Sequence, residues 1–231
     1  MTTFAAAKQE EAMLDNLKKY HVVLASNSPR RRMLLEGLDI PFEVKVLPDI
    51  DESYPPGMPL EQVAEHIACE KAAAYKPLMA DDELIITADT IVIVDESPLQ
   101  PPPEGEASFA AAPLPSGEGL GVRLLGKPRD KDDAVRMLHM LSDHTHRVVT
   151  GVCLTAKGRE RRFSATTDVT FKHLTDEEIA YYLEKYRPYD KAGAYGVQEW
   201  IGYVGVSAIS GSFYNVMGFP VQRVYNELAA F

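Results

Sequence analysis

A short apolar run that leads directly into a helix start, at residues 21–38, constrains the fold of this chain more than any other stretch. Residues 21–25 are mostly apolar and predict a buried strand, which ends where small polar residues begin. Ser28 is a favourable N-cap, Pro29 suits the first helical position, and Gly37 is predicted to end the helix. The predicted apolar side of this helix consists of Met33, Leu34, Leu35 and Leu38.

The first turns of this predicted helix carry three consecutive arginines, Arg30, Arg31 and Arg32. Unpaired backbone N–H groups, the positive end of the helix dipole and the guanidinium groups all favour a bound phosphate at such a position. A capped helix with a solvated basic turn would contain the same residues. The stretch therefore permits two interpretations, and the rest of the sequence has to decide between them.

The charge balance makes one class of partner unfavourable. Of 231 residues, 24 are Lys or Arg and 34 are Asp or Glu, which gives a formal net charge of −10. Because so acidic a chain lacks a long basic footprint, we expect no duplex nucleic acid as a partner. No apolar run has membrane-spanning length, and the first residues lack the pattern of a signal peptide. We therefore expect no membrane association and a cytoplasmic location.

The two cysteines, Cys69 and Cys153, lie far apart in stretches with ordinary helix and strand patterns. Their number and spacing match neither a disulfide framework nor a metal-binding motif. We therefore interpret both as buried thiols.

Apolar periodicity divides the chain into alternating elements. Helices are predicted at residues 59–75, 130–141, 175–186 and 220–229, and strands at 42–46, 83–94, 147–155, 162–171 and 203–209. This alternation predicts an α/β protein with a mixed sheet. Residues 1–20 predict an amphipathic helix packed outside the main fold. Residues 97–123, rich in proline and glycine, predict a flexible surface insertion.

Two polar residues, Asp89 and Thr90, interrupt the β-branched apolar run of residues 83–94. Burying an unpaired carboxylate costs on the order of several kcal/mol, so Asp89 needs a partner or a ligand. Either a structural partner or a functional site explains it, and a functional site is the interpretation that we favour.

Six short motifs, taken together and in this order, resemble the Maf family of nucleoside triphosphate pyrophosphatases. They are residues 24–31, 70–72, 88–90, 126–128, 146–151 and 190–198. The resemblance extends from about His21 to the C-terminus. It implies a single catalytic domain at residues 21–231 and an elongated α/β fold with two lobes around a cleft, related to inosine triphosphate pyrophosphatases. It also implies hydrolysis between the α and β phosphates of a nucleoside triphosphate, a divalent metal (Mg²⁺ or Mn²⁺) and a homodimer.

The chemistry of phosphoryl transfer agrees with these residue types. The reaction needs cations along the polyphosphate, and Arg30, Lys71 and Lys127 can supply them. It also needs carboxylates that hold a metal and orient or deprotonate water, and Glu52 and Asp89 can supply those. Following the resemblance, Asp89 is the candidate general base and Glu52 a metal ligand or second carboxylate, although these roles could be exchanged or shared.

Each assignment has a simpler alternative. Lys71 on a helix has the character of a surface lysine, and Lys127 before a proline that of a loop charge. Glu52 follows Asp49 and Asp51 in a stretch that could be no more than a solvated acidic loop.

Substrate specificity depends on fewer residues. The branch of the family that favours dTTP and UTP resembles this chain at Arg30, Thr90 and Gln198, and the family motifs also place Ser26, Asp190 and Lys191 in the substrate site. The amide of Gln198 offers both a donor and an acceptor to the carbonyl and imide N–H of uracil or thymine, whereas cytosine reverses part of that pattern. One departure is that Glu199 and Trp200 follow Gln198 where many members have glycine. His146 is expected to form structural hydrogen bonds only.

The predicted function is hydrolysis of dTTP and UTP, with modified pyrimidine nucleotides also possible, to the monophosphate and pyrophosphate in nucleotide-pool house-cleaning. Two alternatives remain. One is a purine-directed pyrophosphatase of the same fold, against which Thr90 and Gln198 argue. The other is a nucleotide-binding regulator, for example of septum formation, whose hydrolysis is incidental; the carboxylates argue for an enzyme, because a binder of polyanions gains nothing from them unless they hold a metal.

Overall fold

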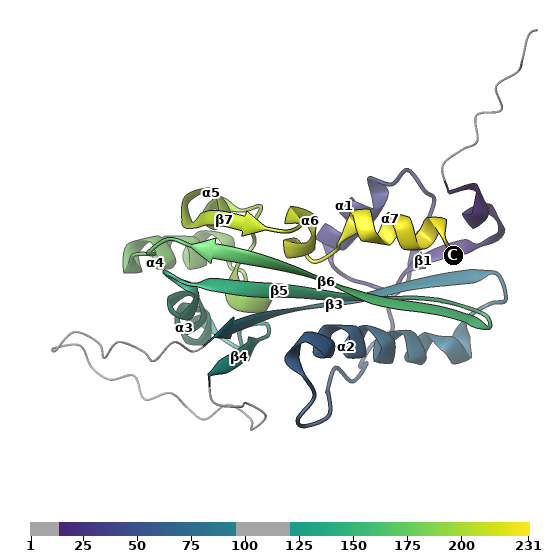
Figure 1. The fold of residues 1–231 in the computed structure, drawn as a ribbon, viewed down its shortest axis with the longest axis horizontal. Coiled ribbons are helices and arrows are strands. Elements are labelled where there is room, and N and C mark those ends of the chain that lie inside the picture. The colour runs from purple at the N-terminus through teal and green to yellow at the C-terminus, as the bar shows by residue number, and fades with distance from the viewer. Residues whose placement is uncertain (1–13, 96–120) are drawn as a thin grey trace, which may run out of the picture.

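The computed structural model describes residues 14–95 and 121–231. Within these residues, seven strands form one sheet in the order β2-β1-β3-β5-β6-β7, with β4 paired to β3 (Figure 1). The strands are β1 (His21–Leu24), β2 (Glu43–Val44), β3 (Glu83–Asp95), β4 (Val122–Leu125), β5 (Thr145–Ala156), β6 (Arg159–Phe171) and β7 (Val206–Ser210). β1 pairs in parallel with β2 and β3, whereas the other pairs are antiparallel. The sheet is mixed, as predicted.

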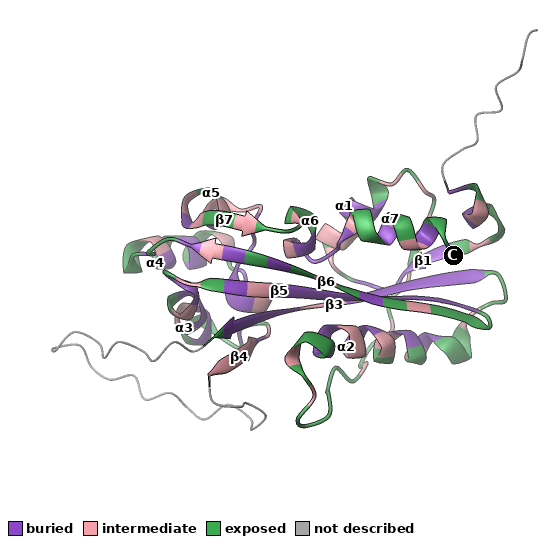
Figure 2. Cartoon of the chain, in the orientation of Figure 1, coloured by how far each residue is buried: buried purple, intermediate pink, exposed green. Residues whose placement is uncertain are grey.

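Helices flank both faces of this sheet (Figure 1). They are α1 (Pro29–Glu36), α2 (Leu60–Tyr75), α3 (Lys131–Leu141), α4 (Asp176–Tyr186), α5 (Trp200–Gly205), α6 (Phe213–Val216) and α7 (Val221–Ala229), with short 3₁₀ turns η1 (Asp15–Lys19), η2 (Lys76–Leu78) and η3 (Ala192–Ala194). α2 covers one face, and α1 and α7 cover the other. The long central strands β3, β5 and β6 give the molecule its elongated shape, and their buried residues, with those of the helices facing them, form the core (Figure 2).

The capping signals in the sequence explain where several helices begin. The Ser28 side chain accepts a hydrogen bond from the backbone N–H of Arg31, and Pro29 occupies the first turn of α1. Asp130 caps α3 in the same way, and Thr175 forms a capping box with Glu178 at the start of α4. Local side-chain chemistry therefore sets these helix starts.

α2 lies unusually close to the sheet at Gly151 on β5. A Cβ atom at Gly151 would lie 2.2 Å from the backbone nitrogen of Glu65 and 2.4 Å from the carbonyl oxygen of Ala64. Only glycine permits this approach, because any side chain would push the helix away. The hydroxyl of Thr87 on β3 also donates a hydrogen bond to the carbonyl of Ala68, at 2.7 Å. These two contacts fix the position of α2 over the sheet.

One edge of β3 carries a gap between two partner strands. β5 pairs with β3 along its other edge from Leu84 to Val94. On the edge shared by β1 and β4, pairing with β1 reaches Ile86 and pairing with β4 begins at Val92. Among the described residues, no strand pairs with that edge between these two positions. Asp89 and Thr90 lie in this gap, so the topology exposes a stretch of central strand whose backbone and side chains can serve a site.

Several sequence-based expectations about element bounds are wrong. The predicted strand at residues 203–209 begins only at Val206, because Tyr203 belongs to helix α5. Met33 is 51% exposed, so the apolar side of α1 is narrower than predicted and depends on Leu34 and Leu35. The predicted strand at residues 42–46 is reduced to the two residues of β2.

The two predicted peripheral segments fall mainly on residues 1–13 and 96–120, which lie outside the described residues. The described end of the first segment is a 3₁₀ turn, η1, and not an α-helix. It packs into the fold rather than outside it, since Leu14 and Leu17 are buried in the main core and the Asn16 amide donates to the carbonyls of Leu228 and Phe231. The last residues of the second segment, Val122 and Arg123, are part of strand β4 and not of a loop.

Candidate active site

A cleft of about 530 Å³ opens over the gap in the β3 edge. Its walls come from the turn between β1 and α1, the loop before α2, α2 itself, β3, the loop at residues 126–128, and the segments 190–198 and 216–218. All ten predicted site residues line it: Ser26, Arg30, Glu52, Lys71, Asp89, Thr90, Lys127, Asp190, Lys191 and Gln198. Segments as far apart in the sequence as Ala25 and Gly218 therefore meet at one place, which no single motif could have established.

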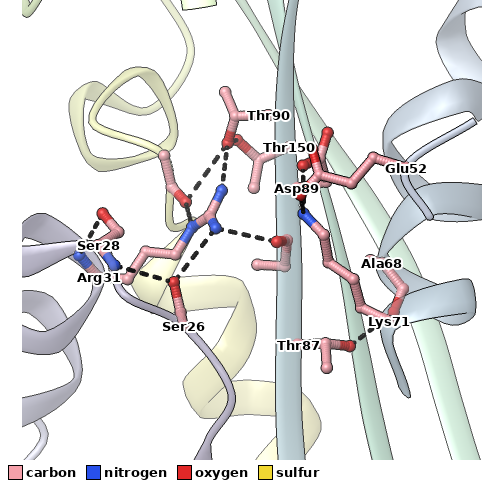
Figure 3. A network of polar contacts seen from close by, with 12 residues as sticks. Ser26, Ser28, Arg31, Glu52, Ala68, Lys71, Thr87, Asp89, Thr90 and Thr150 are labelled. Carbon is pink, nitrogen blue, oxygen red and sulfur yellow. Dashed lines mark hydrogen bonds and ion pairs between the residues drawn. The ribbon is translucent and has the colours of Figure 1, made fainter. Parts of the chain in front are cut away.

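A lysine joins two carboxylates at one end of the cleft, here called the carboxylate end and defined by Glu52, Lys71 and Asp89. Lys71 projects from α2, and its Nζ lies 2.7 Å from Oδ1 of Asp89 and 2.9 Å from Oε1 of Glu52 (Figure 3). Asp89 therefore has the partner that a largely buried aspartate on a central strand requires. Lys71 is 13% exposed at its side chain, so it is not the ordinary surface lysine that its residue type indicates.

The charge of Glu52 is set by its neighbours. Burial acts to raise its pKa, but the hydrogen bond and charge of Lys71, with the charges of Lys127 and Arg31, outweigh burial and lower the pKa of Glu52 below its ordinary value. Glu52 is thus ionised at neutral pH, although half of its side chain is exposed. It is more than a solvated loop residue, since it belongs to the same ion-pair group as Asp89.

Arg31 closes the opposite side of β3 and is the main residue that sequence reasoning missed. Its guanidinium group donates to the carbonyls of Gly218 (2.8 Å) and Ala88 (2.9 Å) and to the hydroxyls of Thr90 (3.1 Å) and Ser26 (3.4 Å) (Figure 3). The Ala88 carbonyl lies in the gap of the β3 edge, so Arg31 occupies a position that a neighbouring strand would otherwise fill. Desolvation lowers the pKa of Arg31 from its usual value.

The other two arginines of the basic turn make different contacts from those of Arg31. Arg30 donates to the Met217 carbonyl at 3.3 Å and pairs with Asp190 at 3.0 Å. Arg32 is exposed and pairs with Glu36 on its own helix at 2.9 Å. The triplet of arginines in the sequence is therefore divided: two side chains organise the cleft and one is a solvated surface residue.

Another part of the cleft wall, here called the amide end, contains Gln198 and a continuous chain of charged groups. Arg30 contacts Asp190, Asp190 contacts Lys191 at 2.7 Å, and Lys191 contacts Glu199 at 3.1 Å. Tyr182 completes the chain, because its hydroxyl donates to Oε2 of Glu199 and accepts from the backbone N–H of Gly196 at 2.9 Å.

Burial shapes the titration of this chain. Burial acts to raise the pKa of Asp190, but hydrogen bonds from Lys191 and Arg30 outweigh it and hold that pKa below its ordinary value. Burial and the Glu199 carboxylate together raise the pKa of Tyr182, which keeps its hydroxyl protonated. Glu199, the departure from the usual glycine, therefore binds the segment 190–198 to α4 through Tyr182.

Gln198 carries a buried polar atom without a partner. Its Oε1 accepts no hydrogen bond from any described residue, although it is shielded from solvent. Buried polar groups are nearly always paired in folded proteins, and an exception at a cleft wall marks a position where a ligand can complete the pairing. This amide is thus a candidate reader of a ligand's hydrogen-bonding edge.

Two further residues support the cleft from behind. Thr150 on β5 contacts Thr90 at 3.0 Å and donates to the Asn215 carbonyl at 3.2 Å, so Thr90 is held on both sides. His146 is buried and its Nε2 lies 2.8 Å from the hydroxyl of Tyr195, a cleft residue. Burial lowers the pKa of His146 to about 3, so the ring is neutral and structural, as predicted.

The cleft differs in charge from the rest of the molecule. Of the described residues that line it, five are basic (Arg30, Arg31, Lys71, Lys127 and Lys191) and four are acidic (Asp49, Glu52, Asp89 and Asp190). The complete chain has a net charge of −10, so basic groups are concentrated here. A small polyanion therefore has a favourable site in the cleft of an otherwise acidic protein.

The carboxylate end also has the donor set for a divalent metal. Lys71 contacts one oxygen of Asp89 and one of Glu52, and the second oxygen of each carboxylate has no hydrogen-bond or ion-pair partner among the described residues. Mg²⁺ and Mn²⁺ prefer such oxygen ligands and are commonly held by one or two carboxylates together with substrate phosphates. The carboxylates of Glu52 and Asp89 therefore fit the divalent metal that the family resemblance implies.

An α/β fold with a cation-lined, carboxylate-bearing cleft defines a protein that binds a small phosphorylated ligand. The comparisons with known proteins specify the family. The family model described as Maf-like protein matches residues 21–231, from the first residue of β1 to the end of the chain. The chain belongs to the Maf family.

Several curated relatives align over nearly their full length. A dTTP/UTP pyrophosphatase of Parabacteroides distasonis is 55% identical over 219 residues, which cover 95% of this chain and 100% of the relative. A dTTP/UTP pyrophosphatase of Porphyromonas gingivalis is 53% identical over 221 residues, covering 95% and 98%. One of Flavobacterium johnsoniae is 38% identical over 214 residues, covering 93% and 96%. The likeness therefore includes every segment that lines the cleft.

Proposed function

We propose that this protein hydrolyses dTTP and UTP between the α and β phosphates, releasing the nucleoside monophosphate and pyrophosphate. The observation that carries the proposal is the group Glu52–Lys71–Asp89 on one wall of a cleft whose other end presents the unpaired amide of Gln198. The names of the relatives, which align along the whole cleft, supply the substrate class. Removal of such triphosphates from the nucleotide pool is the role that we assign to the reaction.

The triphosphate is oriented with its phosphates at the carboxylate end. Lys71 and Lys127 supply positive charge there, and Arg30 supplies it from the neighbouring wall. Charge develops on the pyrophosphate leaving group in the transition state, and pre-positioned cations stabilise it without reorganisation. Lys71, already neutralised by Asp89 and Glu52, can shift its contacts from carboxylate to phosphate when the substrate enters.

Water attacks the α phosphorus from the side opposite the leaving pyrophosphate. Asp89 accepts the proton of this water, as the general base, because it is the least exposed carboxylate of the carboxylate end. A Mg²⁺ or Mn²⁺ ion held by Glu52 and Asp89 would offset phosphate charge and make the water more acidic. The two carboxylates share the work of holding the metal and accepting the proton, and Glu52, which is more exposed, has the greater part in the first.

The nucleobase of the substrate is recognised at the amide end. Gln198 presents a donor and an acceptor, and its Oε1 is unpaired until a ligand N–H reaches it. The imide N–H and adjacent carbonyl of uracil and thymine satisfy both groups, whereas cytosine leaves one pair mismatched. Thr90, held by Arg31 and Thr150, and Ser26 complete the substrate site that we propose.

We also propose a homodimer, which the family resemblance implies, and a cytoplasmic location, which the sequence pattern favours. Within the described residues, no helix combines the length and apolarity needed to cross a membrane. The predicted exclusion of duplex nucleic acid follows from the net charge of −10 and likewise remains a proposal.

The direct test is a product assay with UTP, dTTP, CTP, GTP and ITP in the presence of Mg²⁺ or Mn²⁺. We expect the unmodified protein to release pyrophosphate and monophosphate from UTP and dTTP. Asp89→Asn should release neither product, and Gln198→Glu should show a weaker preference for pyrimidine nucleotides. Preference for GTP or ITP would instead support a purine-directed pyrophosphatase. Tight binding without turnover of any nucleotide would favour a regulator.

A further inference from the structure

A second group of reactive side chains lies under α2, outside the cleft. Cys69 on α2, Cys153 on β5 and Glu160 on β6 each bring one ligand atom to within 4.8 Å of the others. In residues 14–95 and 121–231, this is the one group of three His, Cys, Asp or Glu side chains with such spacing. The cysteines, which we interpreted from the sequence as buried thiols and not as a metal site, are therefore neighbours, and Cys69 is only partly buried.

Pairing of β5 with β6 explains how the group is assembled. Glu160 lies directly opposite Thr155 in the ladder, and Thr155 is two residues from Cys153 on the same face of the sheet. α2 covers this face, and the close approach at Gly151 brings the helix near enough for Cys69 to join. Three separate elements thus contribute one ligand atom each.

The environment of the sulfurs suits a metal thiolate. Cys153 is buried and Cys69 is half-buried. Their sulfur atoms lie within 4.8 Å of each other, close enough to bind one ion together. The hydroxyl of Thr155 lies 3.3 Å from Sγ of Cys153 and can donate to a thiolate there.

The charges of the three ligands and of Lys76 would together be neutralised by a bound divalent cation. Two thiolates and one carboxylate carry three negative charges, and a divalent ion leaves one of them. Lys76 offsets it, since its Nζ lies 2.7 Å from Oε2 of Glu160 and leaves Oε1 available as a ligand. Glu160 and Thr155 also line a second cavity, of about 600 Å³, so the carboxylate side of the group borders a space that solvent can enter.

We propose that Cys69, Cys153 and Glu160 bind a thiophilic divalent cation of the Zn²⁺ type, separate from the metal of the cleft. Two sulfur ligands and one carboxylate oxygen are a ligand set that selects zinc over magnesium. Water from the adjacent cavity completes a tetrahedral shell. Binding displaces the thiol protons and ties α2 to β5 and β6. Because Cys69 is two residues from Lys71, the ion also stabilises the helix that carries the cleft lysine.

The test uses Co²⁺ as a spectroscopic probe of the complete, reduced protein. Cobalt bound by thiolates gives sulfur-to-metal charge-transfer absorption and visible bands typical of tetrahedral sites, whereas cobalt bound by carboxylates in the cleft gives neither. We expect these bands to appear at one equivalent of Co²⁺ and to disappear when Zn²⁺ is added. Zinc affinity is then measured by competition with a chromophoric chelator, and Zn²⁺ is expected to raise the melting temperature.

Three variants make the test decisive. Cys69→Ser should abolish the charge-transfer bands, and Glu160→Gln should weaken zinc binding by at least about tenfold. Both positions are at least partly exposed, so folding is checked by circular dichroism. The control, Glu52→Gln in the cleft, should retain the bands unchanged. Absence of the bands in the unmodified protein, or their persistence in Cys69→Ser, would overturn the proposal. Formation of a Cys69–Cys153 disulfide in the presence of Zn²⁺ would do so as well.

Discussion

The two ends of the cleft treat charge in different ways. At the carboxylate end, Lys71 is shared between Asp89 and Glu52, Glu52 is half-exposed, and each carboxylate keeps an oxygen without a described partner. At the amide end, Arg30, Asp190, Lys191, Glu199 and Tyr182 form a closed chain in which Lys191 and Tyr182 are buried. The first arrangement can exchange partners if it binds the phosphate and metal that we propose, whereas the second holds the segment 190–198 in place.

This difference matches the demands of the two tasks. Phosphoryl transfer requires groups that change partners or protonation during turnover. Base recognition requires a fixed donor and acceptor pattern, because discrimination comes from leaving the wrong base unpaired in a rigid site. Substitutions at the carboxylate end should therefore affect catalysis more than stability, and substitutions of Glu199 or Tyr182 in the charged chain of the amide end should do the reverse.

The largest effect is expected from Asp89→Asn. Loss of the carboxylate removes the proton acceptor and a metal ligand, so kcat should fall by about 10³-fold. Steady-state release of pyrophosphate from UTP measures it. Asp82→Asn, the same change at an exposed position before β3, is the control and should retain normal turnover. A decrease of less than about tenfold in Asp89→Asn would remove this residue from the base role.

Gly151→Ala tests whether the carboxylate end depends on the seating of α2. Its Cβ would lie 2.2 Å from the Glu65 nitrogen, so the helix must move, and the free energy of unfolding should decrease by about 2–3 kcal/mol. Turnover should also decrease, because Lys71 moves with the helix. For stability, Gly126→Ala is the matched control, since its Cβ would have no atom within 4 Å. Equal stability of the two variants in urea titrations would contradict the close packing of α2.

Glu199→Gln and Glu52→Gln compare the two ends directly. In Glu199→Gln an amide faces the ammonium group of Lys191, which is only 8% exposed, so stability should decrease by about 2 kcal/mol. In Glu52→Gln the lost pair is half-exposed, and the decrease should stay below about 1 kcal/mol. Denaturant unfolding of both variants provides the measurement. A larger loss of stability in Glu52→Gln than in Glu199→Gln would show that the ion pairs of the amide end are not the more important ones for stability.

Gln198→Glu should change selectivity rather than turnover. A carboxylate cannot donate to the carbonyl of uracil, so the ratio of kcat/KM for UTP over CTP should fall by about tenfold. Gln222→Glu, the same change at an exposed position of α7, is the control. An unchanged ratio would mean that another group reads the base.

The smallest effect concerns pH. The folded-state pKa of Glu52 is lowered, so its pair with Lys71 contributes stability above the ordinary carboxyl value of 4.5 and loses it as the pH falls through the folded-state pKa. The stability difference between the unmodified protein and Glu52→Gln should therefore be greatest near neutral pH and vanish in acid. Urea unfolding at a series of pH values tests this. A difference that grows as the pH falls would contradict the sign.

Local chemistry explains which parts of the fold were predictable. The caps at Ser28, Asp130 and Thr175 and the apolar periodicity of α2 and β3 act within a few residues, so the sequence displays them. The predicted bounds of helices and strands are wrong where contacts between distant segments determine where an element begins or ends. Tyr203 is β-favouring, but α5 includes it because the next segment pairs with β6 only from Val206 onward. The burial of Leu14 and Leu17 likewise depends on the distant C-terminal helix.

The residues that line the cleft were predictable through the motifs, but the contacts among them were not. The resemblance selected Arg30 from three arginines, yet Arg31 makes more contacts in the cleft, because the gap at the β3 edge exposes the Ala88 carbonyl to it. Only the strand register shows that gap. The role of Glu199 depends on Tyr182, which is 17 residues away on another helix. The meeting of Cys69 with Cys153 depends on the glycine at position 151.

The most direct test of the central claim follows the fate of the oxygen that water contributes. UTP is hydrolysed in water enriched in the heavy oxygen isotope, and the products are analysed by mass spectrometry. Attack at the α phosphorus predicts label in UMP and unlabelled pyrophosphate. Label in pyrophosphate, or release of orthophosphate, would place the cleavage at another bond and contradict the arrangement of substrate and Asp89 derived from the cleft.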